Sequence, residues 1–126
     1  MNTVIVVVVV LVVLLGGRAL KQRRYAQVRD EARQVLERGA VVVDARSAME
    51  FSGGHHQGAV NLPVGDAAHA AAKLGSTQRP VVVYCASGAR SGRLAITLRQ
   101  QGFEKVLDLG TLHNMRGLPA GRPPRR

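Results

Sequence analysis

Residues Val4 to Leu15 form an unbroken apolar run, and positions 1–17 carry no charged side chain. As an α-helix, this uncharged stretch would extend about 26 Å, slightly less than the hydrocarbon core of a bilayer at about 30 Å. Adding Ala19 and Leu20, with Arg18 and Lys21 reaching toward the headgroups, makes the segment long enough to cross. The sequence therefore predicts a transmembrane helix at residues 1–20, and any globular fold must be built from the rest.

The charges around this run predict its orientation. Basic residues follow the run at Arg18, Lys21, Arg23 and Arg24, whereas positions 1–3 hold none. Since basic residues stay on the cytoplasmic side, we expect a single-pass anchor with the N-terminus outside and the following domain in the cytosol. A cleaved signal peptide is the main alternative, but it requires a basic start and a small-x-small cleavage site, which this segment lacks.

The charge distribution and the cysteine count restrict the partners. The net charge is +10, and most of the excess lies in residues 18–38 and 116–126, on either side of the central region. Basic flanks that contain a single aromatic residue, Tyr25, favour contact with membrane lipid over nucleic acid. A single cysteine excludes an intramolecular disulfide and suits a reducing compartment.

Strand-like and helix-like segments alternate after the anchor. Residues 20–38 have the pattern of a basic amphipathic helix, and short helices are expected at 48–51, 66–74 and 91–101. Short apolar strands are expected at 40–44, 58–63, 81–84 and 105–109. This order predicts an α/β fold with a small parallel sheet flanked by helices. We divide the chain into an anchor at 1–20, a linker helix at 21–39, a domain at 40–119 and a basic, disordered tail at 120–126.

The single cysteine, Cys85, lies where the strand at 81–84 leads into the helix that begins near Ser91. Backbone N–H groups at a helix N-terminus are unpaired and carry partial positive charge, so they bind anions and lower the pKa of a nearby thiol. Gly88 permits a tight turn, and Arg90 adds a fixed positive charge. A buried structural cysteine is the alternative, but this loop favours a reactive thiolate.

The central region resembles a rhodanese-like domain over residues 41–119. The resemblance rests on segments in a characteristic order: 43–46 with 50–51, 54–63, 83–91, 102–103 and 117–119. It implies a membrane-anchored, single-domain sulfurtransferase in which Cys85 forms a persulfide. The implied substrates are a thiosulfate-like anion as donor and a thiol or cyanide-like acceptor, without a metal or other cofactor.

The same resemblance suggests roles for the residues around Cys85. The loop residues Ala86, Ser87, Gly88, Ala89 and Arg90 would bind the donor anion, and Arg90 would either pair with that anion or fix the loop. Asp44 and Arg46 form an expected buried pair that supports the loop from the neighbouring strand. The three histidines at positions 55, 56 and 113 match no metal-ligand spacing.

Two features leave the function open. Rhodanese-like domains usually carry a Gly-Gly pair and a Trp after the last strand, whereas this chain has Gly110 followed by Thr111 and no Trp. The wall that faces the sulfur is therefore undefined. A membrane-tethered persulfide carrier or regulatory module without turnover is an alternative. A cysteine-based phosphatase is less favoured because its arginine would stand one position later, where this chain has Ser91.

Overall fold

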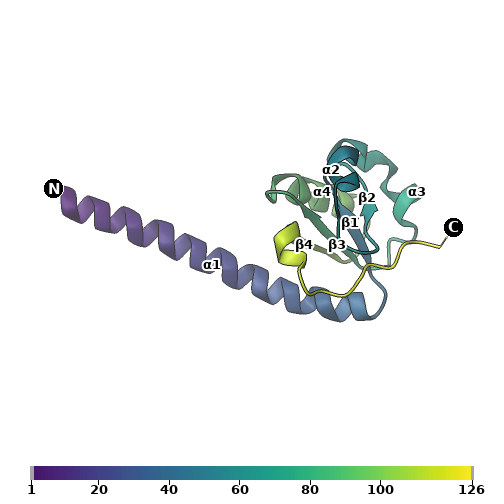
Figure 1. Cartoon of the computed structure of the whole chain (residues 1–126), viewed down its shortest axis with the longest axis horizontal. Helices are drawn as coiled ribbons and strands as arrows, with labels where there is room; N and C mark the ends of the chain where they lie inside the picture. The colour runs from purple at the N-terminus through teal and green to yellow at the C-terminus, as the bar shows by residue number, and fades with distance from the viewer. Residues whose placement is uncertain (1, 126) are drawn as a thin grey trace.

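The computed structural model describes residues 2–125, and its longest element is the helix α1 (Thr3–Glu37). The helix is continuous through the apolar run and the basic segment that follows. Its first part projects away from the domain, so the side chains of Val4 to Leu15 are all exposed (Figure 1). Among the described residues, α1 is the one helix long and apolar enough to cross a membrane, and a signal sequence would meet the same criteria.

Four parallel strands form the centre of the domain, as predicted. They are β1 (Val41–Asp44), β2 (Val60–Asn61), β3 (Val81–Cys85) and β4 (Val106–Thr111), in the order β2-β1-β3-β4. The two central strands are valine-rich and buried at every position, which suits a strand covered on both faces. The expected α/β fold with a small parallel sheet is confirmed.

The two faces of the sheet are covered by different elements (Figure 1). Side chains of alternate strand residues point to opposite faces. Val41, Val43, Val81, Val83 and Cys85 pack in a core with α3 (Ala70–Leu74) and α4 (Ala89–Gln100). The opposite face, which includes Val42, Val82 and Tyr84, is covered by the last turns of α1 and by the 3₁₀ helix η2 (Leu112–Met115). The second half of α1 is therefore part of the domain core.

Two short helical segments show how local sequence shapes the fold. The helix α2 (Ala48–Ser52) starts with the expected capping box, in which Ser47 and Glu50 cap each other's backbone. The helix expected at 66–74 is instead a 3₁₀ helix, η1 (Val64–His69), followed by α3, with a kink at Asp66. Ala67 and Ala70, three residues apart, are both buried, and the 3₁₀ repeat aligns such positions, while Leu74 is buried one α-helical turn after Ala70.

The chain after Pro119 also differs from the expected disordered tail. The amide of Gly121 donates to the carbonyl of Gln57 at 2.9 Å, and that of Arg122 donates to Ala40 at 3.0 Å. Gly121 is buried against Val42, at a place where a Cβ would come within 2.8 Å of the valine side chain. The glycine thus lets the chain lie against the sheet as far as Arg122.

Candidate active site

The candidate active site forms where β3 passes into α4. Cys85 is the last residue of β3, and its side chain is fully buried. The chain then turns at Gly88, which has a positive φ of 97° and precedes α4 as its N-cap. This turn directs the amide of Gly88 to the Sγ of Cys85, at 3.0 Å. The thiol therefore sits beside the positive end of a helix, as the sequence predicts.

Opposing effects set the acidity of this thiol. Burial raises the pKa of Cys85, because it disfavours the charged form. Hydrogen bonds from the Ser91 side chain, and from the amides of Ser91, Gly88 and Ser87, outweigh burial and bring the pKa below its ordinary value. The loop thus stabilises a thiolate with amide and hydroxyl dipoles.

Ser91 is a contributor to the site that the sequence analysis treats only as the start of a helix. Its side chain is fully buried. The hydroxyl lies 3.1 Å from the carbonyl oxygen of Gly88 and 3.3 Å from that of Gly110. The hydroxyl has one proton, so it donates to one acceptor at a time. The sulfur of Cys85 is a third possible acceptor besides the two carbonyl oxygens. A serine in the first turn of a helix that follows a cysteine is the sequence signal by which Ser91 could be recognised as a site residue.

Arg90 lies at the end of the loop, and its guanidinium is bound by a carboxylate. Its Nη1 and Nη2 donate to the two carboxylate oxygens of Glu50 at 2.7 and 3.0 Å. This bond is the main reason why the pKa of Glu50 falls to about 2, with further lowering by the Ser47 backbone and hydroxyl. Of the two predicted roles for Arg90, the contacts favour fixing the loop, here to α2.

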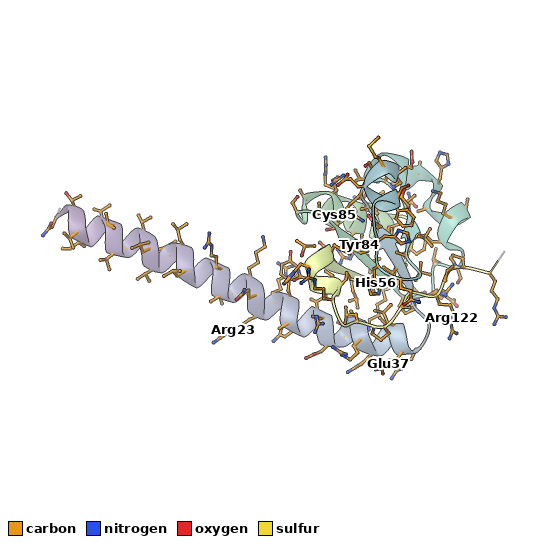
Figure 2. All side chains as sticks on the ribbon, in the orientation of Figure 1. Arg23, Glu37, His56, Tyr84, Cys85 and Arg122 are labelled. Atoms are coloured by element: carbon orange, nitrogen blue, oxygen red, sulfur yellow. The ribbon has the colours of Figure 1, made fainter. Side chains whose placement is uncertain are left out.

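Asp44 and Arg46 form the buried pair expected at the end of β1. The Arg46 guanidinium donates to the Asp44 carboxylate at 2.7 Å and to the carbonyl of Gly54 at 2.6 Å. The hydroxyl of Tyr84 donates to the same carboxylate at 2.7 Å and accepts the amide of His56 at 3.0 Å. The network joins β1, β3 and the loop at 54–56. Figure 2 labels two of its members, Tyr84 and His56, together with Cys85, which follows Tyr84 in β3.

The remaining predicted residues occupy different surroundings. Ala86, Ser87 and Ala89 lie exposed on the loop. Nδ1 of His55 lies 2.8 Å from the carbonyl oxygen of Phe51, and its ring stacks on that side chain with centroids 3.7 Å apart. Within residues 2–125, no group of three or more His, Cys, Asp or Glu side chains is arranged to hold a metal ion.

Together the fold and the site define an α/β domain with one buried thiol at the start of a helix, where loop dipoles lower the pKa of that thiol. Residues 28–111 match the model of the family described as Rhodanese-like domain. The chain therefore belongs to the rhodanese-like domain family.

Relatives agree with this assignment. The chain is 35% identical over 89 residues to the Uncharacterized protein YqhL of Bacillus subtilis (strain 168), covering 71% of this chain and 70% of that protein. It is 39% identical over 82 residues to the Thiosulfate sulfurtransferase GlpE of Pseudomonas aeruginosa (strain LESB58), covering 64% and 72%. A solved structure of a rhodanese with anions from E. coli superposes with a TM-score of 0.59 at 26% identity, covering 62% of this chain and 93% of that one. The predicted family is confirmed, and it includes named sulfurtransferases.

Proposed function

We propose that this chain is a sulfurtransferase that moves sulfane sulfur from a thiosulfate-like donor to a thiophilic acceptor through a persulfide on Cys85. The observation that carries the proposal is the geometry of the thiol. Its Sγ accepts the Gly88 amide at 3.0 Å at the start of α4, and its pKa is lowered. A thiolate that accepts hydrogen bonds from loop amides suits both attack on sulfur and retention of an anionic persulfide.

The chemistry takes two displacements at sulfur. The Cys85 thiolate attacks the outer sulfur of thiosulfate, an S–S bond forms, and the S–S bond of the donor breaks as sulfite leaves with the electron pair. The outer sulfur of the persulfide then bonds to the acceptor. Cyanide leaves as thiocyanate, or a thiolate leaves as its persulfide, and the Cys85 thiolate is regenerated. In both steps the loop amides stabilise the negative charge on sulfur.

The proposal also places the domain at a membrane. The apolar first part of α1 is fully exposed, and basic residues follow it at Arg18 and Lys21. An exposed apolar helix of this length is stable in lipid, and the flanking charges favour a cytoplasmic domain. A protease that digests the domain only after permeabilisation of sealed, cytoplasm-filled membranes would support this topology. Digestion of the domain from the outside would overturn it.

The decisive experiment measures the mass of the intact chain after incubation with thiosulfate. Wild type is expected to gain one sulfur atom on Cys85, cyanide should remove it with release of thiocyanate, and Cys85→Ser should gain none. If wild type gains no sulfur from thiosulfate or from any other sulfane donor tried, the proposal fails. Sulfur that is gained but transferred to neither cyanide nor thiols would identify a persulfide carrier instead. Hydrolysis of an aryl phosphate that requires Cys85, without sulfur uptake, would indicate a phosphatase.

A further inference from the structure

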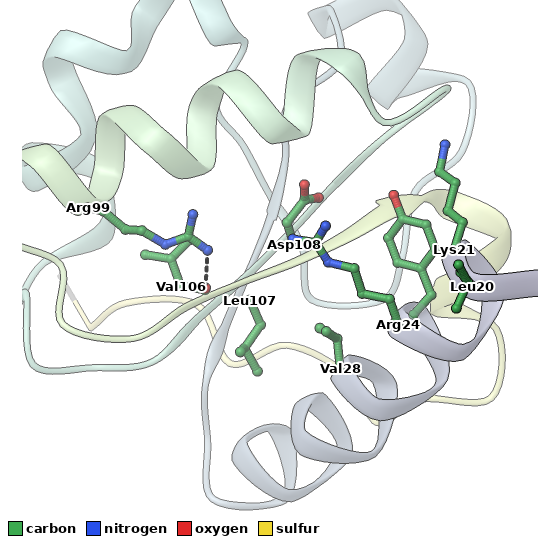
Figure 3. A pocket seen from close by; sticks show the side chains of 9 residues that line it. Leu20, Lys21, Arg24, Val28, Arg99, Val106, Leu107 and Asp108 are labelled. Atoms are coloured by element: carbon green, nitrogen blue, oxygen red, sulfur yellow. Dashed lines mark hydrogen bonds between the residues drawn. The ribbon is translucent and has the colours of Figure 1, made fainter. Parts of the chain in front are cut away.

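A cavity lies between α1 and the edge strand β4, shortly after the apolar run of α1 ends. Its volume is about 470 Å³. Figure 3 shows that Lys21 and Arg24 come from α1, whereas Arg99 comes from α4 and Asp108 from β4. The rest of the lining is Tyr25 and four aliphatic side chains, those of Leu20, Val28, Val106 and Leu107. The cavity thus combines three cations and one carboxylate with an apolar surface.

The two walls of this cavity are held together by contacts between α1 and the domain. Tyr25 lies so close to Gly110 in β4 that a Cβ built on this glycine would lie 2.8 Å from the phenol oxygen. One turn further along α1, Nε of Arg29 donates to the carbonyl of Asn114 at 3.1 Å. A ligand in the cavity therefore meets side chains of the helix and of the domain in a preorganised arrangement, which lowers the entropic cost of binding.

The cations of the cavity can accept an anion. Within residues 2–125, Lys21, Arg24 and Arg99 form no ion pair with a carboxylate. Arg99 uses Nη2 for a backbone carbonyl of β4 at 2.8 Å and retains further N–H donors. The acidic residue of the lining, Asp108, accepts the amide of Gly110 through Oδ1 at 2.9 Å. Three cations against one carboxylate leave two positive charges in excess, which suits a group with several anionic oxygens, such as a phosphate.

The position of the cavity along α1 matches the headgroup layer of a membrane. With the proposed anchor at residues 1–20, Lys21 is the first residue beyond the span, and Arg24 lies about 6 Å beyond Leu20 along the helix axis. The headgroup layer on each side of a bilayer is about 5–8 Å thick. The side chains of Val4 to Leu15 are exposed. A lipid beside α1 would therefore have its acyl chains along this run and its headgroup at the cavity.

We infer that this cavity binds the phosphate group of an anionic membrane phospholipid. Lys21, Arg24 and Arg99 surround the phosphate, and the aliphatic side chains contact the glycerol and the first methylenes of the acyl chains. This mixed lining favours an amphiphile over an inorganic anion, which has no apolar surface to bury. The bound lipid connects α1 to the domain and fixes the orientation of the domain at the membrane. The inference rests on the membrane placement in the proposed function and is independent of sulfur transfer.

Native mass spectrometry of the full chain in a neutral detergent tests the site. Dioctanoyl phosphatidylglycerol, which is anionic, and dioctanoyl phosphatidylcholine, which has no net charge, are titrated separately, and the fraction of the chain with one bound lipid is measured. Wild type should bind one phosphatidylglycerol about tenfold more tightly than phosphatidylcholine, because the choline cation opposes the positive lining of the cavity.

Two matched double variants separate the cavity from the general charge of α1. Lys21→Gln/Arg24→Gln removes two cations from the lining, and Arg18→Gln/Arg23→Gln removes two cations of the same helix from outside it. The first should weaken phosphatidylglycerol binding by about tenfold, because it removes charge-assisted hydrogen bonds to the phosphate. The second should weaken it by less than about twofold, because charges exposed to water are screened.

Arg99→Gln tests the domain side of the cavity, and Arg93→Gln, which is exposed on the same helix α4, is its control. Arg99→Gln should weaken phosphatidylglycerol binding by about threefold, because one of three cations is lost, and Arg93→Gln should leave it unchanged. Melting temperatures without added lipid show whether each variant is folded. Inorganic phosphate and glycerol 3-phosphate, added at the concentration of the lipid, should not displace it, because they lack acyl chains.

Equal losses in the two double variants would show a diffuse attraction to lipid and overturn the inference, as would equal affinity for phosphatidylcholine or wild-type affinity in Arg99→Gln. Displacement of the lipid by either soluble phosphate would assign the cavity to a soluble compound instead. Failure of the proposed function gives different results. Without sulfur transfer, the lipid results hold while thiosulfate adds no sulfur to Cys85. Without an anchor, the chain is absent from the membrane fraction of cells, which fractionation measures separately.

Discussion

The neighbouring strands β1 and β3 end at the same edge of the sheet, and each presents a polar group there with opposite surroundings. β1 ends in Asp44, whose carboxylate accepts hydrogen bonds from the backbone and guanidinium of Arg46 and from the hydroxyl of Tyr84. β3 ends in Cys85, whose sulfur is met by the amide of Gly88 and by other dipoles of the loop. The guanidinium of Arg46 places a full positive charge against the carboxylate at the end of β1, whereas the sulfur at the end of β3 is contacted by dipoles.

This contrast distinguishes a structural network at the end of β1, formed by Asp44, Arg46 and Tyr84 and called the frame below, from the thiol at the end of β3. A buried carboxylate with an arginine in a fixed, bidentate-like contact holds two segments together and is costly to break. A thiolate stabilised by amides keeps a free lone pair for attack on sulfur. Arg90, the cation at the end of the loop, is held by Glu50 rather than by the sulfur. We therefore expect changes at the β1 end to affect stability, and changes at the β3 end to affect the reactivity of the thiol.

The largest effect is expected from Asp44→Ala. The substitution leaves Arg46 and the hydroxyl of Tyr84 buried without their shared acceptor. Removing one member of a buried pair costs about 3–5 kcal/mol, a large part of the stability of a domain of this size. Thermal or urea unfolding of the full chain in detergent measures it. The folded fraction should still alkylate at Cys85 with the wild-type pH profile, and a displaced profile would contradict the separation of frame and thiol.

Tyr84→Phe should weaken the same frame by a smaller amount. It keeps the ring packed in the core but removes the hydroxyl that joins Asp44 to the amide of His56. An unsatisfied buried donor costs about 1–3 kcal/mol, so the unfolding free energy should fall by less than in Asp44→Ala. Since both changes act on one network, their effects in the double variant should be clearly less than additive. Full additivity would show that Tyr84 acts outside the Asp44 network.

Ser91→Ala should act on the thiol and leave the frame unchanged. The hydroxyl is among the groups that lower the pKa of Cys85, so its loss should raise that pKa. A raised pKa leaves less thiolate at neutral pH, and the rate of Cys85 alkylation against pH should shift its midpoint upward. Cys85→Ser is the control for modification elsewhere. An unchanged midpoint would mean that the amides alone set the acidity of the thiol.

The sequence predicts the local parts of these two strand ends and misses the distant ones. Cys85, Gly88 and the start of α4 follow one another along the chain, so strand, turn and helix signals are sufficient to place the thiol at a helix N-terminus. Asp44 and Arg46 are two residues apart, so their pairing can also be predicted from the local sequence.

The contacts that the sequence does not predict depend on register and on helix length. Tyr84 meets Asp44 because β1 and β3 pair in that register, with the two residues 40 positions apart. Arg90 meets Glu50 because α2 and the start of α4 come together, again 40 positions apart. Tyr25 meets Gly110 only because α1 continues without a break from the apolar run to the sheet. Patterns within a short stretch of sequence do not predict contacts between residues so far apart in the chain.

The smallest effect is expected where the two regions are connected, at the Arg90–Glu50 pair. Glu50 and Arg90 are both partly exposed, so solvent and salt screen the pair and Glu50→Gln should lower the melting temperature only slightly. The pKa of Glu50 is depressed from 4.5 to about 2 in the folded state, chiefly by the hydrogen bond from Arg90. A depressed pKa contributes stability above the unfolded-state value and loses it as pH falls through that window. The small difference between wild type and Glu50→Gln should therefore shrink as pH falls from about 4.5 to about 2, and also shrink in high salt at neutral pH. A difference that grows with acidity would mean that the carboxylate destabilises the loop, and Arg90 would then be available to a bound anion.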